Sequence, residues 1–371
     1  MEIRILLIIG LYYPVIGGAE RECQKHAESF QRLGFKVIVL TQYIKGLPEF
    51  EIINGVSVYR AIKPTKPWAI TYLLSVLRFM IKKRNEYDVV QSYGIFYHTT
   101  ASVIMKYIYK KKVINRLESA GQNGDLGRIK KIKYGFLVKL SWKKGDKLIA
   151  ISREIYNDLI NSGVHKEKIT YIPNSVDTEY YTPFISKRWD FPINILFVGR
   201  LSEEKGVNIL LHAMMQVVGK GFNDLSLTIA GDGPLREELE EKVNDLAITK
   251  YVRFVGSINN VIQYYHNSHV LVIPSNWEGL PLVLLEGMAC GLAIVASNLG
   301  GNQEGIEDGI NGLLFSPGQV TELSSKIIYF LEHLGKAKEM GKISREKAVA
   351  HFSLRQNIHK YVELYKSLLA Q

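Results

Sequence analysis

Two glutamates eight positions apart, Glu278 and Glu286, occupy the segment of the sequence that is best suited to chemistry. The apolar run Val270–Ile273 predicts a buried strand leading into a loop, Pro281 suits the first position of a helix, and Gly291 is placed to end it. Glu278 is therefore expected in the loop and Glu286 about one turn into the helix. The helix start favours a phosphate, Glu286 can accept hydroxyl hydrogen bonds from a ribose, and Glu278 can reach a sugar.

The alternative for Glu286 is a surface position on an exposed helix face. Its neighbours argue against this interpretation because they are apolar: Leu284, Leu285, Met288 and Ala289. A carboxylate within such a helix needs a polar ligand or a protein partner.

A second group of charges follows the strand predicted over Ile193–Val198. Arg200 offers a planar fork of donors, and Lys205 adds a compact charge five residues later in the same strand-to-helix turn. Both can converge on a diphosphate and neutralise charge that builds on a leaving group. The alternative is that both are solvated, as charged side chains in surface loops usually are.

The pair Gly17 and Gly18 precedes a predicted helix after the first strand. Two glycines at a helix start let backbone N–H groups approach an anion closely, although an ordinary loop turn is an equally good interpretation. The spacing Gly-x-Gly-x-x-Gly is absent, which disfavours a nucleotide-dependent dehydrogenase.

Residues that bind metal ions are not clustered in the sequence. There is no Asp-x-Asp motif, whereas proteins that hold a diphosphate through Mg²⁺ or Mn²⁺ need grouped carboxylates. No His/Cys cluster suggests zinc. We therefore expect neither a metal nor another cofactor, and Arg200, Lys205 and a helix start would take the place of the metal.

The cysteine content and the N-terminus predict a cytoplasmic protein. Cys23 and Cys290 are far apart, which argues against a disulfide scaffold and for a reducing compartment. The run Ile3–Ile9 lacks a basic region before it and a small-residue cleavage site after it, so it is expected to be a buried strand and not a signal peptide.

The formal net charge of +11 is concentrated in the first half of the chain. Residues 1–185 contain 29 Lys and Arg against 16 Asp and Glu, whereas the remainder contains 18 against 20. The first half is expected to bind an anionic partner. Nucleic acid, an acidic membrane and a phosphate-bearing substrate all fit this charge. No nucleic-acid recognition motif accompanies it, so we expect no nucleic-acid partner.

Two stretches, Pro67–Arg84 and Arg128–Lys144, mix basic residues with aromatic and aliphatic ones. Helices of this kind can lie in an anionic membrane interface. Neither stretch has an apolar run long enough to span a bilayer. The alternative is an ordinary packed helix with a solvated basic face. A peripheral location on the inner face of the membrane is thus one of two open interpretations.

Strand and helix patterns alternate through both halves, which predicts an α/β fold with two doubly wound parallel sheets. We expect an N-terminal domain over residues 1–180 and a C-terminal domain over 190–350, joined by the proline-containing connector Tyr171–Pro192. A final helix at about 353–371 is expected to cross back to the N-terminal domain. Two such domains facing across a cleft would bring their strand-end loops together, where ligands of these sheets bind.

The sequence resembles the family-4 (group 1) retaining glycosyltransferases, which have the GT-B fold. The resemblance covers nearly the whole chain. Its motifs are Pro14–Glu20, Ile172–Asp177, Phe197–Gly206, Ala230–Leu235, Val255–Gly256, the pair Glu278 and Glu286, which looks like the family's E-x7-E element, and Asn298–Leu314.

The resemblance implies transfer of a hexosyl or related group from a nucleotide diphosphate sugar to a hydroxyl acceptor, with the anomeric configuration kept. The expected setting is cell-surface polysaccharide or glycolipid synthesis, in which the acceptor can be lipid-linked. The N-terminal domain would be the acceptor side and the C-terminal domain the donor side. The residues implied in catalysis or donor binding are Gly17, Gly18, Glu118, Arg200, Lys205, Gly256, Glu278, Gly279, Leu280, Pro281, Leu282, Val283 and Glu286.

Within this set, Arg200 and Lys205 would bind the diphosphate and Glu286 the ribose, while Glu278 would contact the transferred sugar near its reacting face. The strand end near Gly256 would hold the base, and Gly18 would approach the phosphates. A same-face attack, with the departing diphosphate acting as base, needs electrostatic stabilisation more than a protein nucleophile.

The chain departs from the family pattern after the strand predicted over Val113–Leu117. Many relatives have a histidine there, and here Glu118 takes the position, where it could contact a sugar hydroxyl or accept a proton. His98 is a possible substitute, although a lone histidine on a helix is more often structural. The polar, glycine-rich segment Ser119–Asp125 is a plausible acceptor-side loop.

Two other classes of protein share the expected architecture. A sugar-nucleotide epimerase would have the same two-domain plan without needing the Glu278 and Glu286 element. A non-catalytic sugar-nucleotide-binding protein would keep much of the same site, because binding and catalytic residues largely coincide in it.

Overall fold

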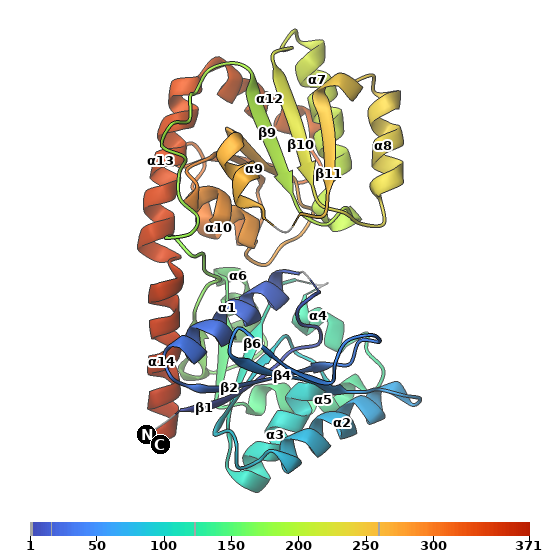
Figure 1. Cartoon of the computed structure of the whole chain (residues 1–371), viewed down its shortest axis with the longest axis vertical. Coiled ribbons are helices and arrows are strands. Elements are labelled where there is room, and N and C mark those ends of the chain that lie inside the picture. Colours follow the sequence, from blue (N-terminus) through green and yellow to red (C-terminus); the bar gives the residue numbers. More distant parts are fainter. Residues whose placement is uncertain (1–2, 16, 122–123, 259) are drawn as a thin grey trace. The chain divides into compact units, whose positions relative to one another are not determined.

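The computed structural model describes residues 3–15, 17–121, 124–258 and 260–371. The chain forms two compact units, drawn in Figure 1: Met1–Asn174 with Arg355–Gln371 make unit 1, and Ser175–Leu354 make unit 2. The boundary lies a few residues before the expected domain end at residue 180. The reason is that the connector packs in unit 2, where Arg345 Nη1 donates a hydrogen bond of 2.7 Å to the Tyr181 carbonyl.

Unit 1 is built on an eight-stranded sheet in the order β3-β4-β2-β1-β5-β6-β7-β8. The strands pair in parallel except β3 with β4. They are β1 (Arg4–Ile8), β2 (Lys36–Gln42), β3 (Phe50–Ile53), β4 (Val56–Ile62), β5 (Val89–Tyr93), β6 (Lys112–Leu117), β7 (Lys147–Ala150) and β8 (Ile169–Tyr171). The strands expected over Ile3–Ile9 and Val113–Leu117 are present as β1 and β6. Strands β3 and β8 lie at the two edges of the sheet and are short, and most of their residues are partly or fully exposed.

The helices of unit 1 include one from the C-terminus of the chain. They are α1 (Gly18–Arg32), α2 (Trp68–Lys82), α3 (Tyr97–Tyr109), α4 (Asp125–Ile129), α5 (Gly135–Ser141), α6 (Arg153–Asn161) and α14 (Leu354–Leu369). Figure 1 shows α1 on one side of the sheet and α2, α3 and α5 on the other. Helix α14 packs on α1, where the rings of Tyr361 and Tyr365 contact Phe30 edge-on. The C-terminal helix therefore belongs to the unit that contains the N-terminus.

The expectation that Arg128–Lys144 forms a single helix is wrong. The chain forms α4, a turn, α5 and then the short 3₁₀ helix Trp142–Lys144. At the turn, Tyr134 has a left-handed backbone with φ of 55°. Gly135 then passes so close to the Ile129 carbonyl that a Cβ would overlap it. The sequence pattern of alternating basic and apolar residues did not show this close backbone approach.

Unit 2 is built on a six-stranded parallel sheet in the order β11-β10-β9-β12-β13-β14. Its strands are β9 (Ile193–Val198), β10 (Leu225–Ala230), β11 (Val252–Gly256), β12 (Val270–Ile273), β13 (Ala293–Ser297) and β14 (Leu313–Phe315). Its helices are α7 (Val207–Gly219), α8 (Arg236–Asp245), α9 (Ile262–Asn267), α10 (Leu282–Ala289), α11 (Gly300–Gly305), α12 (Val320–Glu332) and α13 (Leu334–His351).

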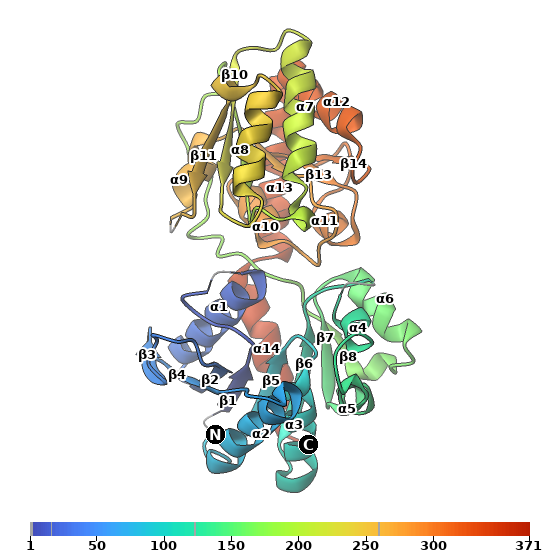
Figure 2. The same cartoon turned by 90° about the vertical axis from the view of Figure 1, so that its right-hand side faces the viewer.

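The sheets confirm the prediction of two doubly wound parallel folds. Strands β12 and β13 are nearly continuous apolar runs, which is typical of a sheet covered by helices on both faces. Figure 2 shows α7, α8 and α13 covering the sheet of unit 2. Within the described residues, no helix combines the length and the apolar character needed to cross a membrane.

Candidate active site

Three loops of unit 2 meet at the carboxyl ends of β9, β10 and β12, and glycines make their close packing possible. Gly206 has φ of 64°, and a Cβ there would overlap the carbonyl of Pro274 in the loop after β12. A Cβ on Gly231 would overlap the Gly199 carbonyl in the same way. These contacts are between backbones, so a side chain at either position would force the loops apart.

Backbone hydrogen bonds join the same loops. The Leu201 N–H donates to the Asp232 carbonyl at 3.0 Å, and the Asn276 N–H donates to the Glu204 carbonyl at 2.8 Å. The glycine-rich segments after the three strands thus form one packed unit at a single edge of the sheet. This is the edge at which parallel α/β sheets bind their ligands.

Lys205 and Glu278 meet within this group of loops. Lys205 Nζ donates to Glu278 Oε1, which also accepts a 2.9 Å hydrogen bond from Ser275 Oγ. The Lys205 side chain is 24% exposed and that of Glu278 is 11% exposed, so the pair is partly shielded from water. Two residues that the sequence analysis placed on different parts of a donor are therefore partners of each other in the folded chain. Ser275 was missed, and its place two residues after the end of β12 is the signal that could have found it.

Glu286 is buried in α10, with 3% of its surface exposed. Its Oε2 accepts a 2.9 Å hydrogen bond from the hydroxyl of Tyr265, a fully buried residue of α9. The alternative interpretation, in which Glu286 lies on an exposed helix face, is therefore wrong. The protein itself supplies at least part of the polar contacts that this carboxylate needs. Contact of Glu286 with a ribose stays a prediction.

The start of α10 lies at the same edge of the sheet. Pro281 is the residue just before the helix and not its first residue, with extended backbone angles of −68° and 133°. The N–H groups of Leu282 and Val283 have no partner within the helix, as in the first turn of any helix. Gly279 packs closely against Gly301: its carbonyl oxygen would overlap a Cβ at that position.

The remaining donor-side candidates lie at neighbouring strand ends. Arg200 is exposed and follows Gly199 in the turn after β9. Gly256 ends β11, and its carbonyl accepts a 2.9 Å hydrogen bond from the Gly231 N–H. Leu280 is buried. All of these residues belong to unit 2.

Gly17 and Gly18 lie at the start of α1 in unit 1. Gly17 is the residue before the helix, and Gly18 is its exposed first residue. The carboxylate of Glu20 folds back against Gly17, where a Cβ would overlap it. Burial raises the pKa of Glu20 above its usual range. This carboxylate lies at the start of α1, where negative charge complements the helix dipole.

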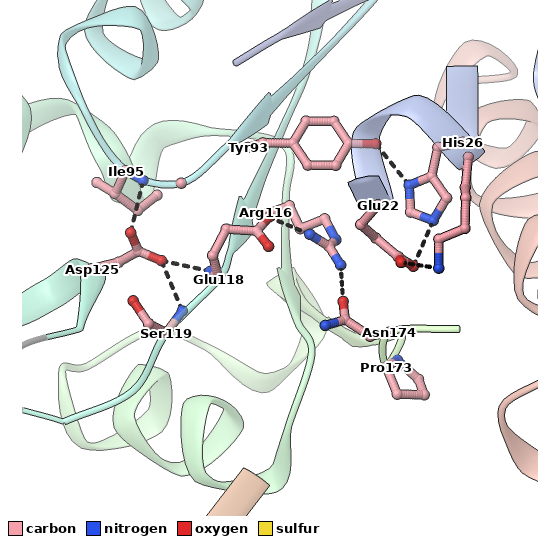
Figure 3. Close-up of polar contacts among 12 residues, drawn as sticks. Glu22, His26, Tyr93, Ile95, Arg116, Glu118, Ser119, Asp125, Pro173 and Asn174 are labelled. Atoms are coloured by element: carbon pink, nitrogen blue, oxygen red, sulfur yellow. Dashed lines mark hydrogen bonds and ion pairs between the residues drawn. The ribbon is translucent and has the colours of Figure 1, made fainter. Parts of the chain in front are cut away.

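Glu118 is the first residue after β6 in unit 1, and Figure 3 shows its contacts. Its Oε1 accepts a hydrogen bond from Arg116 Nη1. Its backbone N–H donates to Asp125 Oδ2 at 2.6 Å, and the Ser119 N–H donates to the same oxygen at 3.2 Å. Burial raises the pKa of Glu118 to about 7, although the Arg116 charge opposes the rise.

His98 does not take the place of the missing histidine. It is buried in α3, where its ring nitrogens lie 3.2 Å from the Tyr72 hydroxyl and 3.2 Å from the Gly94 carbonyl oxygen. Burial lowers its pKa to about 4, so it is neutral at physiological pH. Within the expected acceptor-side loop Ser119–Asp125, residues 122 and 123 lie outside the described residues.

Within the described part of the chain, no group of three or more His, Cys, Asp or Glu side chains could hold a metal ion. The basic Arg200 and Lys205 and the start of α10 are the groups there that could meet a diphosphate.

The fold of the chain is that of known glycosyltransferases. HepE from Anabaena, solved in complex with UDP-glucose, superposes with a TM-score of 0.81 at 20% sequence identity, covering 98% of this chain and 99% of that one. Structural neighbours of this kind are GT-B glycosyltransferases, and the two Rossmann-like units of the chain have the same architecture.

The sequence comparisons specify the family. Residues 184–347 match the family model of glycosyl transferases group 1, and residues 16–180 match that of glycosyltransferase family 4. The chain therefore belongs to the group 1 glycosyltransferases of family 4, and the resemblance seen in the sequence is confirmed.

Two curated relatives are similar over most of their length. An uncharacterized glycosyltransferase of Methanocaldococcus jannaschii is 29% identical over 338 residues, which is 85% of each chain. The UDP-Gal:alpha-D-GlcNAc-diphosphoundecaprenol alpha-1,3-galactosyltransferase of Escherichia coli is 25% identical over 300 residues, which is 77% of each chain.

Proposed function

We propose that the protein transfers a hexosyl group from a nucleotide diphosphate sugar to a hydroxyl acceptor, with retention of configuration and without a metal ion. The observation that carries the donor assignment is the Lys205–Glu278 pair, held within three packed strand-end loops beside the start of α10. Support for the donor class comes from HepE, which was solved with UDP-glucose, and from the E. coli relative, whose name specifies UDP-galactose.

The donor diphosphate would take over the positive groups of this site. Lys205 would exchange its bond to Glu278 for one to a phosphate oxygen, since a diphosphate carries more negative charge than one carboxylate. Arg200 is exposed and would add a bidentate contact, and the N–H groups at the start of α10 would favour the same anion. Glu278 would then be released to accept a hydrogen bond from a hydroxyl of the transferred sugar.

Retention follows if the acceptor attacks from the face that the diphosphate leaves. Positive groups held on the departing diphosphate would stabilise the charge that develops on it, and this is the main demand of such a transition state. The ribose would be bound through Glu286, after its bond to Tyr265 rearranges or is shared.

The donor assignment can be tested with a panel of UDP-glucose, UDP-galactose, UDP-N-acetylglucosamine and GDP-mannose. A bound donor raises the unfolding temperature, because it binds only the folded chain. We expect at least one member to raise it, in EDTA as well as with Mg²⁺, and NMR of the glycoside product should show the donor's anomeric configuration. An epimerised nucleotide sugar as product would favour an epimerase, and binding without any product would favour a non-catalytic protein.

We further propose that unit 1 docks on an anionic membrane, which would give access to lipid-linked acceptors in polysaccharide or glycolipid synthesis. The docking surface consists of exposed apolar residues on α2, α3 and α5, and α3 packs against both other helices. Its residues are Leu74, Ile81, Tyr107, Ile108, Phe136 and Leu140. Phe136 and Leu140 are 59% and 65% exposed.

Charge complementarity supports this partner. Exposed basic residues lie on α2 and α5 and on the segments next to the three helices: Arg78, Lys82, Arg84, Lys110, Lys133, Lys139, Lys143 and Lys144. Basic groups beside exposed apolar side chains suit the interface of an anionic bilayer. The lipid-linked acceptor in the name of the E. coli relative is consistent with such a location. Salt-sensitive co-sedimentation with phosphatidylglycerol vesicles, and none with phosphatidylcholine vesicles, is the expected result.

A further inference from the structure

Glu278 of unit 2 is hydrogen-bonded through one of its two carboxylate oxygens. Its Oε1 accepts a hydrogen bond from Lys205 Nζ and another, at 2.9 Å, from Ser275 Oγ. Both hydrogen bonds that this side chain makes within the described residues fall on Oε1, so Oε2 is available to a ligand. The side chain is 11% exposed and is therefore not sealed from the surface of the unit.

The two donors on Oε1 respond differently to an anion. Lys205 carries its charge on a long flexible stem and is 24% exposed, so a diphosphate attracts it away from the carboxylate. Ser275 is buried, and its neutral hydroxyl is attached directly to Cβ. A diphosphate that takes Lys205 therefore leaves the hydrogen bond from Ser275 in place.

A buried chain of polar groups fixes Ser275 in turn. At the end of β13, Ser297 Oγ donates a 2.6 Å hydrogen bond to the Ser275 carbonyl. From α11, Asn302 Nδ2 donates to the Ser297 carbonyl at 2.8 Å. All three residues are buried, where breaking a hydrogen bond leaves a polar group unsatisfied. The segment that carries Ser275 is thus tied to two neighbouring elements of the same unit.

A sugar is the part of the donor that suits the second oxygen of Glu278. An ionised carboxylate accepts hydrogen bonds and donates none, so it matches a hydroxyl group and repels a phosphate oxygen. Once Lys205 turns to the diphosphate, the carboxylate keeps its charge but loses one of its two donors. A hydroxyl of the sugar that is attached to the same diphosphate can replace that donor.

We propose that Ser275 is the positioning residue for recognition of the transferred sugar. It holds Glu278 Oε1 after Lys205 has moved to the diphosphate, so that Oε2 accepts a hydrogen bond from one sugar hydroxyl. This inference rests on the proposed function. It separates the two halves of donor recognition: Lys205 serves the diphosphate, and Ser275, acting through Glu278, serves the sugar.

The test measures two dissociation constants by isothermal titration calorimetry. The first ligand is the member of the donor panel named above that binds the wild type most tightly, and the second is its nucleoside diphosphate without the sugar. The variants are Ser275→Ala, Glu278→Ala and the double variant. Ser324→Ala is the matched control, because Ser324 is a buried serine of unit 2 whose hydroxyl donates to Gln216 Oε1 at 2.7 Å.

We expect Ser275→Ala to weaken the nucleotide sugar by about tenfold or more, because Glu278 loses a hydrogen bond that orients its charge. The affinity for the nucleoside diphosphate should stay within about twofold of the wild type. In the Glu278→Ala background, Ser275→Ala should have no further effect on either ligand, since the two residues act as one unit. Ser324→Ala should bind both ligands as the wild type does.

Equal weakening of both ligands by Ser275→Ala would overturn the inference, because Ser275 would then support the loop as a whole. Wild-type affinity of Ser275→Ala for the nucleotide sugar, or a further tenfold loss in the double variant, would overturn it as well. Each of these results leaves the proposed function intact as long as the wild type binds and consumes a donor. Failure of every donor to bind the wild type would instead overturn the proposed function. Unfolding temperatures without ligand confirm that each variant is folded.

Discussion

Lys205 and Glu278 lie 73 residues apart in the sequence and form an ion pair between the loops that follow β9 and β12. Ser275 donates to the same carboxylate oxygen, so the Glu278 side chain has a defined position within these loops. The pair therefore links the packing of the loops to the binding of an anion.

Replacing Lys205 should abolish most activity while leaving the fold almost unchanged. We expect Lys205→Ala to lower kcat/KM by at least about 100-fold, because a positive group on the leaving diphosphate is lost. Stability should change by about 1 kcal/mol or less, as is usual for partly exposed pairs. Steady-state kinetics and thermal unfolding measure the two effects.

Lys336→Ala is the matched control for this change, because Lys336 forms an exposed ion pair with Glu339 at 2.9 Å, also in unit 2. It should leave turnover at the wild-type level. If Lys205→Ala behaved like this control, Lys205 would have no part in donor binding.

Substitutions of Glu286 and Tyr265 should distinguish the effect on donor binding from the effect on stability. Glu286→Ala leaves the buried Tyr265 hydroxyl without this acceptor, which should cost about 1–3 kcal/mol of stability and remove the thermal shift caused by a donor. Tyr265→Phe should cost about 1–2 kcal/mol and keep most of the thermal shift, because the carboxylate remains. Donor titrations followed by differential scanning fluorimetry give both numbers. A full donor response in Glu286→Ala would show that the carboxylate serves the fold alone.

Much of the fold was predictable because the central strands of both sheets contain runs of apolar residues. The pattern located strands such as β9 and β12 and the helix α10 to within one or two residues. It missed the edge strands β3 and β8, whose exposed residues give no such run.

The candidate site was predictable where a motif lies next to a strand end, as for Lys205 and Glu278. It was not predictable where the partner comes from a distant part of the chain. Tyr265 binds Glu286 from another helix, and Tyr361 contacts Arg116 across a separation of 245 residues. Such pairs depend on tertiary packing, which no local spacing encodes.

Gly206 should be intolerant of any side chain. Its φ of 64° and the closeness of the Pro274 carbonyl mean that Gly206→Ala adds both backbone strain and overlap, with a cost of about 3 kcal/mol. Because Lys205 is the preceding residue, turnover should fall as well. Gly219→Ala is the control: a Cβ there meets nothing within 4 Å, so stability should be unchanged or rise by up to about 1 kcal/mol. Equal unfolding temperatures for the two variants would contradict the packing described for these loops.

The docking surface on α2, α3 and α5 should bind anionic vesicles through apolar and basic groups together. Phe136→Ser with Leu140→Ser should weaken binding to phosphatidylglycerol vesicles by about tenfold or more, since two exposed apolar side chains can no longer enter the interface. Binding of the wild type should weaken as salt is raised. Ile185→Ser, a change at a 99% exposed residue of unit 2, should leave co-sedimentation unchanged. If the double variant binds as tightly as the wild type, these helices are not the membrane contact. If the wild type does not bind anionic vesicles, the excess of basic residues in unit 1 serves another anion.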